Sequence, residues 1–146
     1  MEGELYVNRA SPPQGPPARR AERGEVSLIE SGSLPGFGGP PLHRHDFDET
    51  FYVIEGELTF QLGDALFTRK AGELAFAPRG EPHTYANQSE SPTRHLIVCT
   101  PAGFERYFAR MAAERRGEEP PEWALQPIPE STVVGPRIGK PPGDEP

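Results

Sequence analysis

The chain has 146 residues, of which 34% are hydrophobic, and this suits one domain with one compact core. Its net charge is -7, and its 15 Lys+Arg form no cluster the size of a face, so nucleic acid is excluded as an expected partner. We find neither a run of about 18 apolar residues nor a signal peptide at the start, and therefore expect a cytoplasmic protein without membrane association.

The 16 Gly and 19 Pro divide the chain, because residues 42–77 contain no proline while residues 12–17 and the last third are rich in it. We predict an organisation in four parts: a Pro-rich N-terminal arm (1–24), a barrel (25–100), a C-terminal helix (101–117) and a Pro/Gly-rich tail (118–146).

Short apolar runs alternate with turn residues through the predicted barrel, as in an all-β domain. The predicted strands are 26–31, 42–45, 50–55, 57–62, 65–69, 73–77, 83–87 and 94–100. Gly, Pro, Asn and Asp separate them and supply a positive or a fixed φ. Short strands in regular succession favour a barrel or a jelly roll. Cys99, the single cysteine, lies in the apolar run HLIVC and is expected to be a small buried side chain.

After the last strand, apolar residues recur at helical spacing and predict one α-helix over 101–117. They are Phe104, Tyr107, Phe108, Met111 and Ala112. Thr100 suits the N-cap, Pro101 the first helical position and Gly117 the left-handed residue past the end.

We expect Phe108 and Met111 to serve as packing residues. Phe104 is nearest the last strand and is a candidate to reach the open end of the barrel. In the tail, Trp123 is a candidate anchor and residues 131–134 a candidate edge strand.

Three of the four histidines and one glutamate are candidate metal ligands: His43, His45, Glu49 and His83. This donor set suits Fe, Mn, Ni, Co or Zn better than Ca or Mg. His43 and His45 are two apart in an extended strand, so both imidazoles point to one face. Glu49 can face inward on the next strand, and His83 would close the site from across the barrel. His95 is expected to be a packing residue.

The ligands lie within two longer patterns. One contains Gly72, Pro78, Gly80, His83 and Asn87; the other contains His43, His45, Glu49 and Gly56, with Phe37 where a glycine would open it. The chain thereby resembles the cupin superfamily, whose motifs read G-x5-H-x-H-x3-4-E-x6-G and G-x5-P-x-G-x2-H-x3-N. The resemblance covers roughly residues 25–100 and is to small single-domain bacterial cupins of the quercetinase-like, cupin 2 type.

The resemblance implies a double-stranded β-helix with one divalent transition metal ion in its open mouth, and a homodimer. It implies a metal-dependent, dioxygenase-like oxidoreductase acting on a small aromatic or enolic substrate, with Glu49 as a candidate catalytic residue. Tyr85 is the second candidate catalytic residue, because it shares a strand face with His83. A metal-assisted cyclase or isomerase and a non-catalytic small-ligand-binding cupin stay open, because one fold hosts many reactions. The aromatic residues that could line the mouth are Phe37, Phe51, Phe60, Phe76 and Tyr85.

Overall fold

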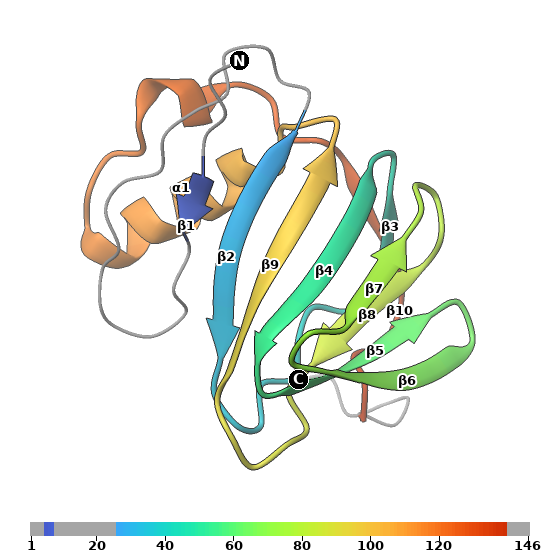
Figure 1. Ribbon diagram of the computed structural model, residues 1–146. Coiled ribbons are helices and arrows are strands. Elements are labelled where there is room, and N and C mark those ends of the chain that lie inside the picture. Colours follow the sequence, from blue (N-terminus) through green and yellow to red (C-terminus); the bar gives the residue numbers. More distant parts are fainter. Residues whose placement is uncertain (1–4, 8–25, 140–146) are drawn as a thin grey trace.

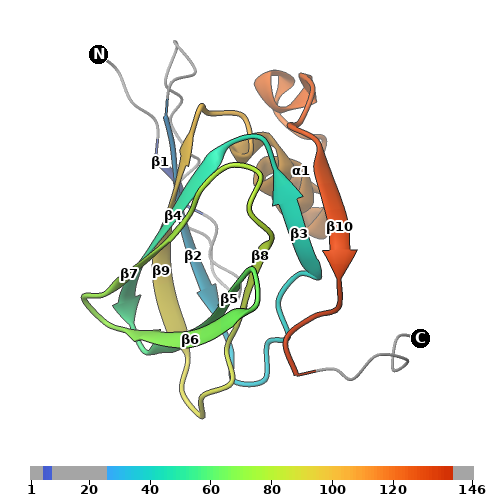
Figure 2. The same cartoon turned by 90° about the vertical axis from the view of Figure 1, so that its right-hand side faces the viewer.

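The computed structural model describes residues 5–7 and 26–139 and shows two five-stranded sheets that face each other (Figures 1 and 2). The first sheet runs in the order β1 (Leu5–Val7), β2 (Ser27–Ser33), β9 (Thr93–Thr100), β4 (Asp48–Glu55), β7 (Leu74–Ala77). The second runs in the order β10 (Ser131–Gly135), β3 (Leu42–His45), β8 (His83–Ala86), β5 (Glu57–Leu62), β6 (Ala65–Lys70). The predicted all-β jelly-roll fold is confirmed, with the predicted strand boundaries correct to within two residues.

The predicted N-terminal arm contains β1, which pairs in parallel with β2, while every other pairing between the described strands is antiparallel. The other residues of the arm, and residues 140–146 of the tail, lie outside the described residues.

The centre of the first sheet follows a strict alternation of inward and outward side chains, as the period of a strand requires. Along β9 the side chains at 93, 95, 97 and 99 are buried, and along β4 those at 49, 51 and 53 are buried. The register places Glu49 opposite Cys99, Phe51 opposite Ile97 and Val53 opposite His95. These pairs form the inner wall on which the site is built. Cys99 is fully buried, as predicted.

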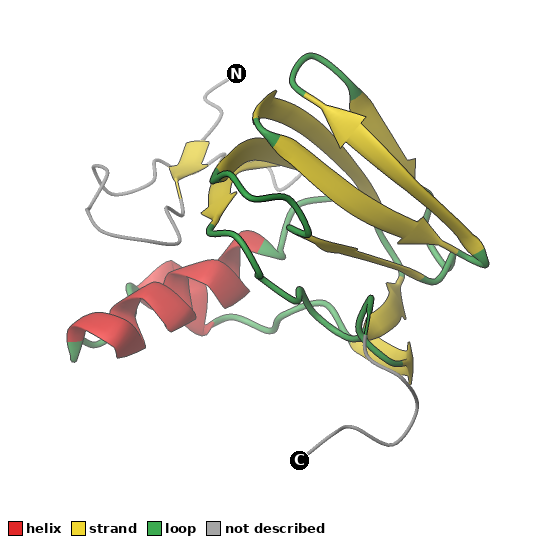
Figure 3. Cartoon of the chain, turned by 90° about the horizontal axis from the view of Figure 1, so that it is seen from below, coloured by secondary structure: helices red, strands yellow, loops and turns green. Residues whose placement is uncertain are grey.

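The helix α1 (Glu105–Arg116) lies on the β2 side of the barrel, outside the strands (Figures 1 and 3). It begins later than predicted, so the assignment of Thr100 as cap and Pro101 as first helical residue is wrong. The physical reason is that Thr100 is still paired with Asp48 in the sheet, and Gly103 has a φ of 143°, which no helix adopts. The end is as predicted: Gly117 is left-handed, with a φ of 65°. No helix in the described residues is long and apolar enough to cross a membrane.

The tail folds back along the helix and then joins the second sheet. The 3-10 helix η1 (Glu122–Leu125) is held to α1 by the Arg110 guanidinium, which donates to the carbonyls of Ala124 and Gln126, both at 2.6 Å. Trp123 packs against the hydrophobic core, as predicted for an anchor. The predicted edge strand is β10, which pairs with β3 and places Ser131 opposite His45.

The loop before β3 depends on Gly39, which lies directly against the Tyr85 carbonyl of β8 and has a φ of 71°. A Cβ at this position would collide with that backbone oxygen. We therefore expect Gly39→Ala to lower the free energy of unfolding by roughly 3 kcal/mol or more. Gly36→Ala is the matched control, because Gly36 also has a positive φ, 81°, but nothing lies near its missing Cβ. It should cost only about 1–2 kcal/mol. Equal costs in urea unfolding would contradict this close packing of the loop on β8.

Candidate metal centre

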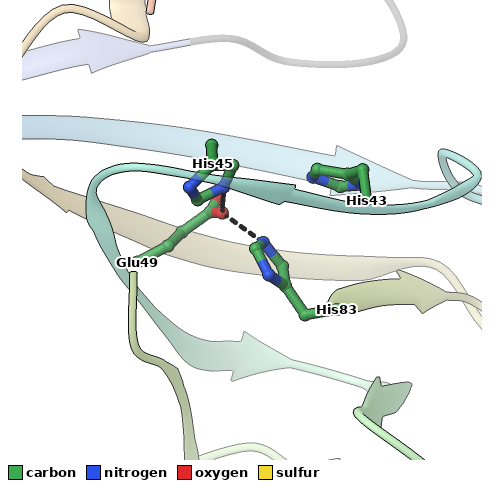
Figure 4. A group of neighbouring side chains, drawn as sticks. All are labelled: His43, His45, Glu49 and His83. Carbon is green, nitrogen blue, oxygen red and sulfur yellow. Dashed lines mark hydrogen bonds and ion pairs between the residues drawn. The ribbon is translucent and has the colours of Figure 1, made fainter. Parts of the chain in front are cut away.

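Four side chains converge at one end of the barrel (Figure 4): His43 and His45 from β3, Glu49 from β4 and His83 from β8. One donor atom from each lies within 4.8 Å of the others. β3 and β8 are neighbours in the second sheet, where His43 is directly opposite His83. β4 belongs to the first sheet, so Glu49, and not His83 as predicted, completes the cluster from across the barrel, because β8 pairs directly with β3. The structure thus brings together all four predicted ligands.

Each of the three imidazoles is oriented by the backbone carbonyl of a residue two positions away in the chain. Their Nδ1 atoms lie 2.7 Å from Pro41 O for His43, 3.0 Å from Phe47 O for His45 and 2.9 Å from Glu81 O for His83. A carbonyl oxygen can only accept, so each Nδ1 donates a proton and Nε2 is the nitrogen that faces the cluster. Anchoring one ring nitrogen in this way is the usual support of a metal-binding histidine.

Glu49 is the centre of the cluster. Its Oε2 lies 2.8 Å from His45 Nε2 and 2.8 Å from His83 Nε2. Because both Nδ1 protons already go to carbonyls, these contacts need additional protons or a shared cation. Two ligands about 2.1 Å from one ion and at right angles to each other are about 3.0 Å apart, so the spacing fits a first-row metal ion.

Electrostatics keep Glu49 ionised. Burial works against the charged form, but the hydrogen bonds from His45 and His83 outweigh it and lower the pKa of Glu49 to about 2. For His83, burial also opposes the charge, and the Glu49 carboxylate outweighs it and raises the pKa. Burial lowers the pKa of His43 and favours its neutral form. An ionised carboxylate among imidazoles fits a divalent transition metal ion.

An aromatic stack covers the cluster on the His45 side. The Phe47 ring lies parallel to the His45 ring with centroids 3.5 Å apart, and Phe47 is fully buried. Phe104, just before α1, lies 5.3 Å from Phe47 and 6.2 Å from His45, and Tyr107 stacks on Phe104. Phe104 thus reaches the cluster, while Phe108 packs against the core. Phe47 was not foreseen, although its position two residues after His45 placed it on the same face.

A second feature that the sequence did not indicate is a clamp between the two turns beside the site. The Arg79 guanidinium donates to both carboxylate oxygens of Asp48, at 3.2 and 3.0 Å, and its backbone N–H donates to the same carboxylate at 2.9 Å. Gly80 N–H donates to His45 O at 2.8 Å. The loop 78–80 is thereby tied to the segment that carries His45 and Glu49.

Tyr85, the second candidate catalytic residue, follows His83 by two residues on β8 and is partly buried. Its ring lies 5.2 Å from Phe51 and 6.2 Å from Phe60. Burial, and next the Glu49 carboxylate, raise the pKa of the Tyr85 phenol, which therefore stays protonated.

Two of the predicted lining aromatics lie elsewhere. Phe76 is 49% exposed, and its predicted place in the mouth is wrong, because β7 turns Ala75 and Ala77 inward and Phe76 outward. Phe37 is 41% exposed, although its ring lies 6.0 Å from that of Tyr85. Phe51, Phe60 and Tyr85 form the inner aromatic wall.

His95 is fully buried inside the barrel and does not belong to the ligand cluster, in keeping with its prediction as a packing residue. Its ring lies 5.2 Å from that of Tyr85 and 6.1 Å from that of Phe51. Burial lowers its pKa to about 4. Neither ring nitrogen has a hydrogen-bond partner among the described residues.

Comparisons with known proteins agree with this architecture. TT1209 from Thermus thermophilus is 30% identical in sequence, and its structure covers 56% of this chain and 78% of its own with a TM-score of 0.52. An uncharacterized conserved protein with a double-stranded beta-helix domain from Klebsiella pneumoniae subsp. pneumoniae MGH 78578 is 25% identical, covers 56% of this chain and 68% of its own, and has a TM-score of 0.51.

A curated relative, endoribonuclease YbeY of Myxococcus xanthus (strain DK1622), is 36% identical over 62 residues, which are 42% of this chain and 21% of that protein. The chain thus spans about a fifth of the length of this relative. The family model described as "Cupin domain" matches residues 19–99, more than half of the chain. Together with the double-stranded β-helix and its His/His/Glu/His cluster, this match shows that the chain belongs to the cupin family.

Proposed function

We propose that the protein is a divalent-metal-dependent enzyme, a dioxygenase-like oxidoreductase that acts on a small aromatic or enolic molecule. The observation that carries the proposal is the convergence of three backbone-anchored imidazoles on one ionised carboxylate, next to an aromatic interior. An ion of Fe, Mn, Ni, Co or Zn held by His43, His45, Glu49 and His83 would supply Lewis-acid or redox chemistry to a chelating substrate.

The protein's own groups have distinct tasks in this proposal. Glu49 is charged at neutral pH and fixes the orientation of His45 and His83. With a pKa of about 2 it is a weak base, so we assign it first as a ligand, and as a proton acceptor only from a strongly acidified enol. Tyr85 remains protonated with its hydroxyl hydrogen-bonded to Ser31, and we assign it as a hydrogen-bond donor to a substrate oxygen.

In this proposal the aromatic residues exclude water from the site. Phe47 is buried against His45, and Phe104 lies next to both. Phe51 and Phe60 form the wall behind Tyr85. Reactive enolate or oxygen intermediates require such a dry enclosure, and flat apolar substrates pack well against aromatic rings.

One observation favours a second candidate, a metal-assisted cyclase or isomerase. Tyr85 is a phenol held in its protonated form near an ionised carboxylate. A proton donor and an acceptor on one site can move a proton within a substrate without any change in its oxidation state. Oxygen consumption separates this candidate from the dioxygenase.

The test uses protein purified without chelators and without nickel affinity resin, in which metal is quantified by mass spectrometry. We expect about one metal ion per chain and oxygen uptake with members of a panel of enolic aromatics. His43→Ala and His83→Ala should retain less than about a tenth of the metal, whereas His95→Ala should retain all of it. Conversion without oxygen uptake would favour the cyclase or isomerase. Metal-loaded protein that converts no member of the panel would contradict the enzymatic proposal and favour a ligand-binding protein.

A further inference from the structure

The first sheet is apolar on its outer face as well as on its inner face. Inward and outward side chains alternate along each strand, and on a sheet with one solvated face the outward ones are usually polar. Here the sequence instead runs FYVI in β4, LAFA in β7 and LIVC in β9. Continuous apolar runs are typical of strands that are buried on both faces. The outward side chains of these strands therefore lack a cover that their composition calls for.

The strand register joins these outward side chains into one surface. Tyr52 of β4 lies opposite both Leu74 of β7 and Leu96 of β9, and in the next row Thr50 lies opposite residues of the same two strands. Figure 1 looks onto this surface, and no element of the described chain lies over β9, β4 or β7 there, since α1 lies beside β2 (Figures 1 and 2). We call the six apolar residues of the two rows the outer patch: Leu28, Tyr52, Leu74, Phe76, Leu96 and Val98.

The sequence outside the described residues lacks the side chains that could cover the outer patch. Residues 8–25 and 140–146 contain no Leu, Ile, Val, Met, Phe, Tyr or Trp, and residues 1–4 contain one such residue, Met1. Apolar surface is stabilised by burial against other apolar groups in proportion to the area buried, which charged and Pro-rich segments do not provide. A cover for the patch must therefore come from a second molecule.

The distribution of charge allows a second copy of the chain to be that molecule. Each copy has a net charge of -7, which opposes association through most of the surface. The outer patch itself contains no charged residue. At one border Arg94 pairs with Glu30 at 3.4 Å, and at another Arg79 pairs with Asp48 at 3.0 Å. The patch is thus a neutral region with neutralised borders, and interface centres are depleted of charge in the same way.

Shape and area also fit a second copy. Two sheets with the same right-handed twist pack face to face at about -30°, so this sheet is complementary in shape to itself. Tyr52, Leu74 and Phe76 are 42%, 54% and 49% exposed. If a side chain of this size exposes about 200 Å² in full, the three present roughly 300 Å². An interface of about 800 Å² per partner contains roughly 450 Å² of apolar surface, and the three partly exposed members of the patch supply most of the difference.

We propose that the outer patch is the interface of a homodimer, in which the first sheets of two copies pack face to face about a two-fold axis. Such an interface uses the same surface of both copies. It lies on the opposite face of the first sheet from the metal centre, because Glu49 points inward whereas Tyr52 points outward on β4. The dimer therefore forms with or without metal, and the inference is independent of the proposed function. An interface of this area gives a dissociation constant in the range of about 1–10 µM.

Sedimentation velocity at protein concentrations from about 1 to 100 µM tests the proposal. Wild type should change from monomer to dimer over this range. Tyr52→Glu and Tyr52→Lys should each raise the dissociation constant at least about 100-fold, because like charges then meet across the two-fold axis. An equimolar mixture of these two variants should dimerise again, because the charges are then opposite. Phe76→Ser introduces no charge and should raise the dissociation constant about tenfold, through the lost apolar contact alone.

Leu66→Glu is the matched control, because Leu66 is 61% exposed but belongs to β6 in the second sheet. Its dissociation constant should stay within about twofold of wild type. Thermal unfolding of each variant shows that it is folded, and Phe76→Ser decides the question if a charge at position 52 prevents folding. A wild type that stays monomeric at about 100 µM would overturn the proposal. So would Tyr52 or Phe76 variants that dimerise as tightly as Leu66→Glu, or a mixture of the two Tyr52 variants that remains monomeric.

Discussion

Glu49→Gln will weaken metal binding by at least about 100-fold, because it removes the charged ligand that both His45 and His83 contact at 2.8 Å. Glutamine keeps the size of the side chain but brings no charge, and its amide nitrogen would repel the metal. Wild type at a metal concentration about 100 times its Kd should gain about 2.7 kcal/mol of stability from the ion, and the variant almost none. Competition with a chromophoric chelator measures the affinity, and thermal unfolding with and without metal measures the gain.

Asp46→Asn is the control for Glu49→Gln. Asp46 belongs to the same acidic segment, but its carboxylate is exposed and is not part of the cluster. Its metal affinity should stay within about twofold of wild type, as surface charges act weakly. If Glu49→Gln bound metal as tightly as Asp46→Asn, the carboxylate would not be a ligand, and three histidines alone would have to account for the site.

Acidification from about pH 6.5 to about pH 4 will remove roughly 3 kcal/mol of stability from the metal-free protein through His95. The folded state holds the pKa of His95 at about 4, below its ordinary value of 6.5. Between these pH values His95 is protonated in the unfolded chain but not in the folded chain. The contribution of His95 to the free energy of unfolding is therefore fully present above pH 6.5 and is lost as the pH falls towards 4. Glu49 acts in a different window: its contribution is present above its ordinary pKa of 4.5 and is lost only as the pH falls towards 2.

Urea unfolding of wild type and His95→Leu at several pH values between about 4 and 7 tests this expectation. The difference in stability between the two proteins should change by roughly 3 kcal/mol over that range, with the leucine variant the less sensitive to acid. Any part that His43 and His83 contribute is common to both proteins and cancels in the difference. Parallel pH profiles would show that His95 is protonated in the folded state as readily as in the unfolded chain.

The strands and the clustering of the four candidate ligands could be predicted because their signals are local. Turn residues separate the runs, and the spacing of His43 and His45 fixes a common face whatever the rest of the fold does. The start of the helix could not be predicted, because β9 continues to Thr100, which pairs with Asp48. That pairing is a contact between distant parts of the chain.

Other features of the site depend on register and packing in the same way. The clamp between Arg79 and Asp48 joins residues 31 positions apart. That His95 has no partner among the described residues follows from which side chains face it across the barrel, and alternation along one strand shows only that it points inward. Phe76 points outward because it alternates with the inward Ala75 and Ala77 on β7. The sequence did not show which of the two faces of this short strand is buried, and an aromatic residue favours the buried one.

The pairing of β10 with β3 determines when the sheet edge beside the metal centre is covered during synthesis of the chain. β3 carries His43 and His45, and of all described elements β10 is translated last. Until residues 131–135 leave the ribosome, one edge of β3 is unpaired beside a cluster that already has every ligand. An open edge of this kind invites pairing with other strands. The nascent protein is therefore most exposed to misassociation in the interval between translation of β8 and translation of β10.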